Sequence, residues 1–248
     1  MTGEIKIRVG NLSKEFDVNF RKSEGALSRL LHIFRSRNNK KLKVLDDVSF
    51  DVNKEDIIGI IGRNGSGKST LLRIMAGIFR PTKGNVSVYG DAIYLSGYGI
   101  GLQQKLTMKE NIYLLGSIMG LSQKNIKSLF DQIVDFSGLK DFVNMRVCFF
   151  SSGMVSRLSF SVSANCINLK RPNILLLDEV FGSGGDLDFQ KKAIEKMEEL
   201  IGEGVTVVLV SHNLELVKKY CNKVIWLDEG KIKEIGKPAE VVLKYEKK

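Results

Sequence analysis

Short apolar runs bounded by turn residues recur along the chain, and between them apolar residues repeat at helical spacing. The most continuous runs are typical of strands buried on both faces of a parallel sheet, and they lie at Ile57–Ile61, Asn173–Leu177 and Val205–Val210. Helical spacing predicts helices over Thr70–Ala76, Lys109–Met119 and Gln123–Phe136. Strands that alternate with helices in this way predict an α/β fold.

Further strands are predicted outside this alternation. Two of them lie near the N-terminus, at Glu4–Val9 and Val48–Val52. Turn residues such as Gly90 and Asp91 predict two hairpins, which pair Asn85–Tyr89 with Ala92–Leu95 and Val224–Leu227 with Lys231–Ile235. The segment Leu158–Ala164 alternates apolar residues with serine, which by periodicity alone favours a strand.

Positive charge is concentrated in one insertion between the first two strands. The chain of 248 residues has a formal net charge of +10, and Arg21–Lys43 holds eight Lys or Arg and a single acid, Glu24. Within this insertion five apolar residues repeat at helical spacing and make a short basic amphipathic helix plausible: Ala26, Leu27, Leu30, Leu31 and Phe34. On charge alone, a solvated loop is the simpler interpretation, and an anionic lipid, nucleic acid or acidic partner is the alternative.

Composition excludes several classes of protein. No apolar run approaches the roughly eighteen residues of a membrane-spanning helix, and the first residues lack the layout of a secretory signal. The three cysteines, Cys148, Cys166 and Cys221, are widely spaced, which favours reduced thiols in a cytoplasm over disulfides or a zinc site. With only His32 and His212 present, a histidine-built metal centre is not expected.

The segment from Gly62 to Thr70 carries the strongest chemical signal. It matches G-x-x-x-x-G-K-[ST], a loop that holds the phosphates of a nucleoside triphosphate, and it lies between a predicted strand and a predicted helix. The nucleotide-binding residues predicted here are Gly62, Arg63, Asn64, Gly65, Ser66, Gly67, Lys68, Ser69 and Thr70. Glycines let backbone N–H groups converge on an anion, Lys68 would reach the β- and γ-phosphates, and the Ser69 hydroxyl would ligate Mg²⁺.

Two acidic residues follow the predicted strand Asn173–Leu177. Asp178 and Glu179 come directly after Ile174–Leu177, about where an ATPase needs its second Mg²⁺ contact. We expect Asp178 to hold the metal through an intervening water, and Glu179 to act as the general base for the attacking water. His212 ends the strand Val205–Val210, which we expect beside the Asp178 strand, so a catalytic role is favoured for it as well.

A second anion site is predicted at Phe150–Met154. Ser151, Ser152 and Gly153 precede a segment that could be helical, and hydroxyls with free N–H groups at a helix N-terminus bind anions. Taken alone the signal is weak, because many helices begin with Ser-Ser. Its position between Lys68 and Asp178 gives it weight.

Together these segments make the chain resemble an ATP-binding subunit of an ABC transporter along its whole length. The order is the phosphate loop, Ser151–Met154, Asp178-Glu179 and His212. Several details resemble the branch that exports O-antigen, capsular polysaccharide or teichoic acid. They are the signature Phe150–Met154 with Met154 in place of glutamine, Arg157–Phe160, Leu45–Phe50, Gly59–Gly65, Thr107–Asn111, Asp178–Val180 and the basic insertion.

The resemblance implies a fold and an assembly. The fold is a P-loop NTPase (RecA-like) core with an antiparallel β subdomain and a helical subdomain at about 97–165, in one domain over residues 1–248. Within that subdomain the resemblance makes Leu158–Ala164 a helix. Two copies would sandwich each ATP between Lys68 of one and Ser151, Ser152, Gly153 and Met154 of the other.

The resemblance also implies further site residues and the partners. Phe16 would stack on adenine, and the region of Tyr98 and Gln103 would take the place of the glutamine that senses Mg²⁺ and the permease. In the family an aspartate usually stands six residues after the catalytic Glu. Here Gly185 has that position, and Asp186 comes one residue later. ATP with Mg²⁺ would drive export of a lipid-linked polysaccharide through a separate membrane permease, with the chain on the cytoplasmic face of the inner membrane.

Two alternatives stay open. One is the ATPase of a drug or lipid exporter. The other is a non-transport ABC module that acts on nucleic acid, suggested by the net charge. A single phosphate loop, the absence of a heptad run and the concentration of basic charge in one insertion argue against this second alternative, so no nucleic-acid partner is expected.

Overall fold

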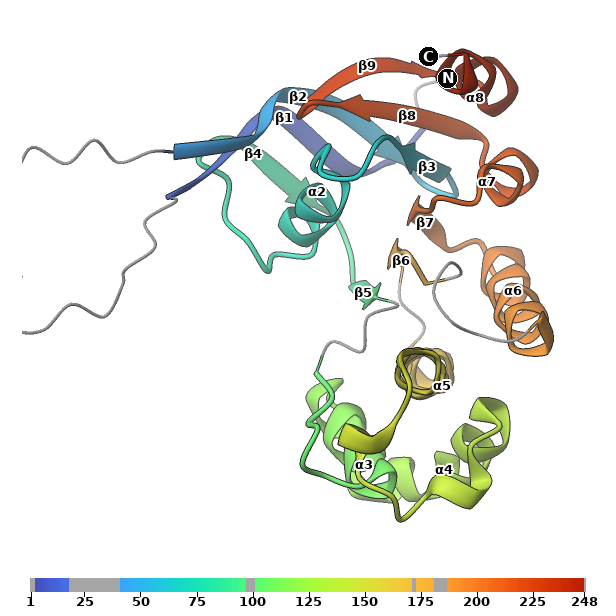
Figure 1. Ribbon diagram of the computed structural model, residues 1–248. Helices are drawn as coiled ribbons and strands as arrows, with labels where there is room; N and C mark the ends of the chain where they lie inside the picture. The colour runs from blue at the N-terminus through green and yellow to red at the C-terminus, as the bar shows by residue number, and fades with distance from the viewer. Residues whose placement is uncertain (1–2, 18–40, 97–100, 171–172, 181–186, 248) are drawn as a thin grey trace, which may run out of the picture.

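The larger of two sheets forms the centre of the molecule (Figure 1). The structure, a computed structural model, describes residues 3–17, 41–96, 101–170, 173–180 and 187–247. In spatial order the larger sheet contains β5 (Ala92–Ser96), β6 (Ile174–Asp178), β7 (Thr206–Val210), β3 (Ile57–Ile61), β8 (Lys223–Asp228) and β9 (Lys231–Gly236). The first five run parallel, and β9 pairs antiparallel with β8, which confirms the predicted C-terminal hairpin. The predicted neighbours β6 and β7 are also confirmed.

The smaller sheet is antiparallel and contains β2 (Lys41–Asn53), β1 (Ile5–Asp17) and β4 (Lys83–Val88). Its first two strands are much longer than predicted. The register of β1 with β2 shifts between Val9 and Leu12, and Asn11 and Asp47 take positive φ angles of 47° and 57°. Such bulges interrupt the alternation of apolar residues. The predicted first strand therefore ends at Val9, although β1 continues to Asp17. Residues 41–43, assigned to the basic insertion, belong to β2.

The predicted hairpin of Asn85–Tyr89 with Ala92–Leu95 is wrong. β4 pairs with β1 in the smaller sheet, whereas β5 pairs with β6 in the larger one. Gly90, with a φ of 130°, lies where the chain passes from one sheet to the other. A Cβ there would lie 2.9 Å from the Asn173 side-chain oxygen. The glycine thus permits a close approach to the start of β6 rather than a tight turn.

Each face of the larger sheet is covered by a separate apolar core. On one face, helix α2 (Lys68–Met75) and the smaller sheet pack on residues such as Ile58, Ile60 and Leu176. On the other face lie α5 (Ser152–Lys170), α6 (Leu187–Gly202), α7 (Leu214–Tyr220) and α8 (Pro238–Glu246). The arrangement is the predicted α/β fold with a P-loop core sheet, an antiparallel β subdomain and helices.

Helices separated from the sheets form the remaining part of the molecule, at the bottom of Figure 1. They are α3 (Met108–Ile118), α4 (Gln123–Ser137), the 3-10 turns η2 (Lys140–Phe142) and η3 (Val147–Phe149), and the N-terminal part of α5. A third core joins them, in which Ile112, Ile133 and Leu158 are completely buried. The segment Leu158–Ala164 is helical, as the resemblance predicted and the alternation did not.

Three predictions fall outside the described residues: the amphipathic helix within 21–40, Tyr98 and Asp186. Among the residues that the structure describes, no helix is long and apolar enough to cross a membrane.

Candidate nucleotide site

The predicted phosphate loop connects β3 to the N-terminus of α2. Its glycines are required by geometry at two positions. Gly62 has a φ of 153°, and a Cβ there would meet the Leu227 carbonyl oxygen at 2.0 Å. Gly67, the residue before the helix, has a φ of 103°, and a Cβ there would lie 2.8 Å from the Val44 carbonyl oxygen. The loop is thereby held tightly against β2 and β8, with its helix pointing its N-terminus into the site.

Lys68 is held on the loop itself. Its Nζ donates hydrogen bonds to the carbonyl oxygens of Gly62 at 2.8 Å and Arg63 at 3.0 Å, and the residue is only 6% exposed. Burial lowers the pKa of the Lys68 amine, and the charges of Glu179 and Asp178 oppose this shift. A buried ammonium close to two carboxylates and a helix N-terminus fits the binding of a polyanion.

Asp178 ends β6 in a fully buried position and receives a donor at each oxygen. The Ser69 hydroxyl donates to Oδ1 at 2.8 Å, and the Tyr94 hydroxyl donates to Oδ2 at 2.8 Å. The structure thus brings together the two residues predicted to hold Mg²⁺. Tyr94, which the sequence analysis missed, is an additional member of the site.

Tyr94 has a second partner in Arg73, whose Nε donates to the tyrosine hydroxyl at 3.3 Å. Burial raises the pKa of Tyr94, with Arg73 opposing and Asp178 reinforcing the shift, so the phenol keeps the proton that it donates. The sequence signal for Tyr94 was a hydroxyl within the apolar strand Ala92–Leu95. Its role could not be assigned because that strand was predicted to pair with Asn85–Tyr89 and not with β6.

Glu179 lies beside His212, as predicted. The His212 Nε2 is 3.2 Å from Glu179 Oε1, and the His212 backbone N–H donates to Oε2 at 3.4 Å. Glu179 has a φ of 54° and is 5% exposed, while the histidine side chain is half exposed. Burial raises the pKa of the Glu179 carboxyl, and the neighbouring His212 and Lys68 oppose that shift. A raised pKa suits a group that accepts a proton near neutral pH.

Two buried oxygen atoms in the site lack a hydrogen-bond partner: Ser66 Oγ and Glu179 Oε1. The contact of Oε1 with His212 is close but does not have hydrogen-bond geometry. Buried polar atoms are nearly always satisfied, so both oxygens point to a ligand that supplies the missing partners. Ser69 and Asp178 provide the hard oxygen donors that Mg²⁺ prefers, with phosphates and waters completing its shell. The residues present therefore fit Mg²⁺ bound with a nucleotide.

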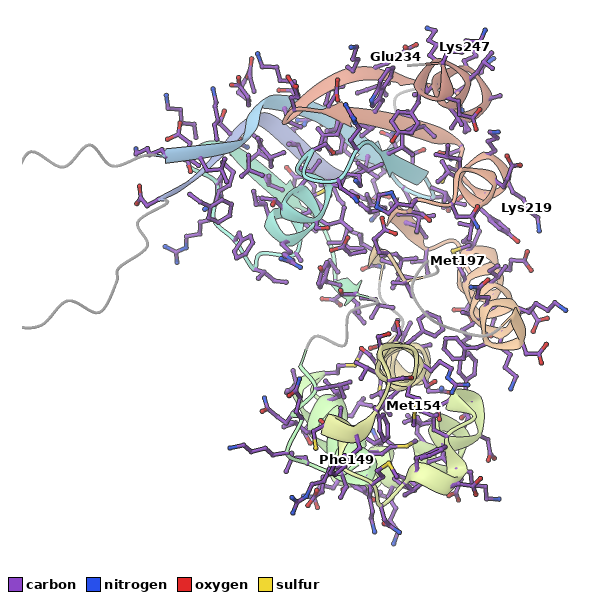
Figure 2. The ribbon with its side chains drawn as sticks, viewed as in Figure 1. Phe149, Met154, Met197, Lys219, Glu234 and Lys247 are labelled. Carbon is purple, nitrogen blue, oxygen red and sulfur yellow. The ribbon has the colours of Figure 1, made fainter. Side chains whose placement is uncertain are left out.

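The predicted signature lies in a different part of the molecule. Ser151 precedes α5, and its hydroxyl accepts a hydrogen bond from the Met154 N–H at 3.2 Å. Ser151 and Ser152 are exposed. Figure 2 shows Met154 among the helices of the lower part, away from α2. Within one copy of the chain, the signature thus does not meet the phosphate loop.

The remaining predicted residues are placed as follows. The Phe16 ring packs edge-on against Phe79 at 5.6 Å, with Lys14 Nζ 4.8 Å from its centroid. Phe79 follows the C-terminal end of α2, whereas the phosphate loop is at its N-terminal end, so stacking on adenine stays a prediction. Gln103 is exposed, and its backbone N–H donates to the buried Asn111 side chain at 2.7 Å.

Asn111 is another residue whose role the sequence analysis did not assign. Its amide nitrogen donates to the carbonyl oxygens of Gln103, Leu106 and Thr107, at 3.0, 3.3 and 2.9 Å. It thereby fixes the turn that leads into α3.

Comparison with known proteins decides the family. The family model described as "ABC transporter" matches residues 45–182, which include the phosphate loop, the signature and the Asp178–Glu179 pair. The chain belongs to the ABC transporter family. It is an ABC-type ATPase, in which ATP hydrolysis is coupled to transport.

Relatives that match nearly all of this chain are found among export proteins. The ATPase is 35% identical over 245 residues to the O-antigen export system ATP-binding protein RfbB of Klebsiella pneumoniae, covering 98% of each chain. It is 38% identical over 246 residues to the Teichoic acids export ATP-binding protein TagH of Lactococcus lactis. That match covers 99% of this chain but 52% of the relative, so the ATPase spans about half the length of TagH.

Solved structures agree on the fold. An ATP-binding subunit of an ABC transporter superposes with a TM-score of 0.72 at 22% identity, covering 97% of this chain and 93% of the other. An ATP-binding cassette solved as a dimer in a post-hydrolysis state with ADP and Pi also gives a TM-score of 0.72, at 19% identity, with coverages of 94% and 98%.

Proposed function

We propose that this ATPase drives the export of lipid-linked O-antigen or a related cell-surface polysaccharide across the inner membrane, through a separate permease. The observation that carries the proposal is the 35% identity to RfbB of Klebsiella pneumoniae over 98% of both chains. Teichoic acid is the related polymer suggested by the TagH relatives. The chain would act at the cytoplasmic face of the membrane, attached through the permease.

The geometry supports a division of labour in hydrolysis. Lys68 and the backbone of the loop would bind the phosphates, while Ser69 and Asp178 would hold Mg²⁺, which neutralises phosphate charge. Glu179 accepts the proton of the attacking water through its buried carboxylate. His212, in contact with Glu179, orients that carboxylate and donates to the reacting phosphate. Phe16 would stack on adenine, and the region of Tyr98 and Gln103 would report the state of the site to the permease.

A second copy of the chain completes this site. Ser151, Ser152, Gly153 and Met154 are separated from Lys68 within one copy, yet Ser151 and Ser152 are exposed at the N-terminus of a long helix. That helix end suits the γ-phosphate of a nucleotide held by the partner. The dimeric state of the solved cassette supports the arrangement.

Deletion of the gene in its native host tests the substrate. We expect long polysaccharide to disappear from the cell surface and to accumulate inside, and the wild-type gene to restore export. A gene encoding Glu179→Gln should fail to restore it at equal protein level. Normal surface polysaccharide in the deletion strain would contradict the proposal. Altered drug or lipid efflux in such cells would then identify the ATPase of a different exporter.

A further inference from the structure

Behind the predicted metal site, four side chains form a continuous chain of hydrogen bonds. Arg73 Nε donates to the Tyr94 hydroxyl at 3.3 Å, and Tyr94 donates to Asp178 Oδ2 at 2.8 Å. On the other side of the carboxylate, Ser69 donates to Oδ1 at 2.8 Å. Ser69 and Arg73 are four residues apart on α2 and so share a face of that helix. The chain of hydrogen bonds therefore starts and ends on one helix and passes through β5 and β6.

The pairing of β5 with β6 places Tyr94 in this position. Ser96 lies opposite Asp178 and Tyr94 lies opposite Leu176, two residues earlier on each strand. Since side chains two apart on a strand share a face, Tyr94 and Asp178 both face α2. The tyrosine ring is half-buried against the core that contains Leu176, so only its hydroxyl is committed to the polar chain.

We propose that Tyr94 is a positioning residue for the metal-ligating carboxylate of Asp178, and that Arg73 acts through Tyr94 by fixing its hydroxyl. The inference rests on the proposed Mg²⁺ site. Asp178 is completely buried, and the hydrogen bond from the Tyr94 hydroxyl to Oδ2 sets the plane of the carboxylate. The plane in turn aligns Oδ1 with the Ser69 hydroxyl, whose donated proton leaves its lone pairs for the cation.

The expected effect of removing the hydroxyl is specific. Partners that orient metal ligands typically contribute 10- to 100-fold to metal affinity. Tyr94→Phe keeps the ring in its apolar contacts and deletes only the hydroxyl, which donates to Asp178 and accepts from Arg73. We therefore expect about 10- to 100-fold weaker apparent Mg²⁺ affinity in the presence of nucleotide. Nucleotide affinity measured in EDTA should be unchanged, because Lys68 and the loop supply it.

The test is a fluorescence titration of the full-length protein with an environment-sensitive ATP analogue, first in EDTA and then with increasing Mg²⁺. Tyr113→Phe is the matched control, since Tyr113 packs on Phe130 in the helical part at a ring distance of 6.0 Å. It should bind Mg²⁺ and nucleotide like the wild type. Thermal unfolding of each variant verifies that it is folded.

A double-mutant cycle separates positioning from a general loss of structure. Arg73→Met should weaken Mg²⁺ affinity in the wild-type background and have no further effect in the Tyr94→Phe background, because it acts through Tyr94. The inference is overturned if Tyr94→Phe titrates with Mg²⁺ like the wild type, or if it loses affinity equally with and without Mg²⁺. It is also overturned if the two substitutions are additive. If nucleotide binding by the wild type itself does not respond to Mg²⁺, the proposed metal site fails instead.

Discussion

Glu179 is the single residue on which the proposed chemistry depends most. Its carboxylate is buried, contacts His212 and lies in the field of Lys68. We expect Glu179→Gln to retain ATP affinity and to lose about 10²- to 10⁴-fold in turnover, the contribution of a well-placed acid–base group. Single-turnover hydrolysis and equilibrium binding distinguish these two effects. Lys68→Ala is the control that should weaken binding itself, and near-normal hydrolysis by Glu179→Gln would remove Glu179 from the mechanism.

The same substitution should stabilise the nucleotide-free protein in a pH-dependent way. Burial raises the pKa of Glu179 above its ordinary value of 4.5, so the folded state binds this proton at a higher pH than the unfolded state. The wild type therefore loses stability as the pH rises through the raised pKa, whereas glutamine carries no charge. We expect Glu179→Gln to have the higher Tm at pH 8, with the difference shrinking toward pH 4.5. A Tm difference that is constant across this range would contradict the shift.

Residues that act within one loop or at one strand end were accessible from sequence. Lys68, Ser69 and Asp178 lie where the motif predicts, and the adjacency of β6 and β7 places His212 beside Glu179 as expected. Tyr94 could not be assigned, because its role exists only through the pairing of β5 with β6. A motif gives the order of site residues along the chain. It does not identify the residues that a neighbouring strand places beside them.

At the scale of elements, the phosphate loop depends on a glycine that no other residue can replace. We expect Gly62→Ala to destabilise the protein severely or prevent folding, since its Cβ would lie 2.0 Å from the Leu227 carbonyl oxygen. Gly77→Ala is the matched control. Gly77 also has a positive φ, of 73°, but nothing lies within 4 Å of its Cβ position, so only about 1–2 kcal/mol of backbone strain is expected. Chemical denaturation measures both, and equal losses for the two variants would contradict the steric argument.

The turn before α3 depends on the buried side chain of Asn111. We expect Asn111→Ala to cost roughly 2–4 kcal/mol, because a network of buried hydrogen bonds is broken and carbonyl groups are left unsatisfied. The free energy of unfolding in urea is the measurement. Asn125→Ala, at an exposed position in α4, should change it by less than about 0.5 kcal/mol. A similar small change for Asn111→Ala would show that water replaces the side chain.

Elements with one consistent period were predicted best, and those interrupted by bulges or sheet crossings were predicted worst. The strands β3, β6 and β7 consist almost entirely of apolar residues, and their positions were predicted closely. By contrast, β1 contains a bulge near Asn11, and Gly90 connects two sheets rather than two strands of a hairpin. Both errors arise because the same turn residues occur at bulges, in hairpins and where the chain passes between sheets. The sequence does not distinguish these cases.

At the scale of the whole molecule, the fold separates the two parts of the proposed nucleotide site. Asp178 ends β6 of the larger sheet and Glu179 follows it, while Lys68 begins α2 after the loop that leaves β3. The signature is carried by the helical part (Figure 1). The sequence resemblance predicted this architecture, including the helical conformation of α5. Periodicity alone could not, because the alternation in α5 is that of a strand.

The most direct test of the account is the mass of Glu179→Gln in solution with nucleotide, measured by size-exclusion chromatography with light scattering. We predict a monomer with ADP and a doubling of mass with Mg²⁺ and ATP. Ser152→Glu in the same background should remain a monomer, although an acid in the first turn of α5 favours the helix, because its charge repels the γ-phosphate of the partner's nucleotide. A variant that stays monomeric with ATP, or one that dimerises regardless of nucleotide and of Ser152→Glu, would contradict an ATP site shared between two copies.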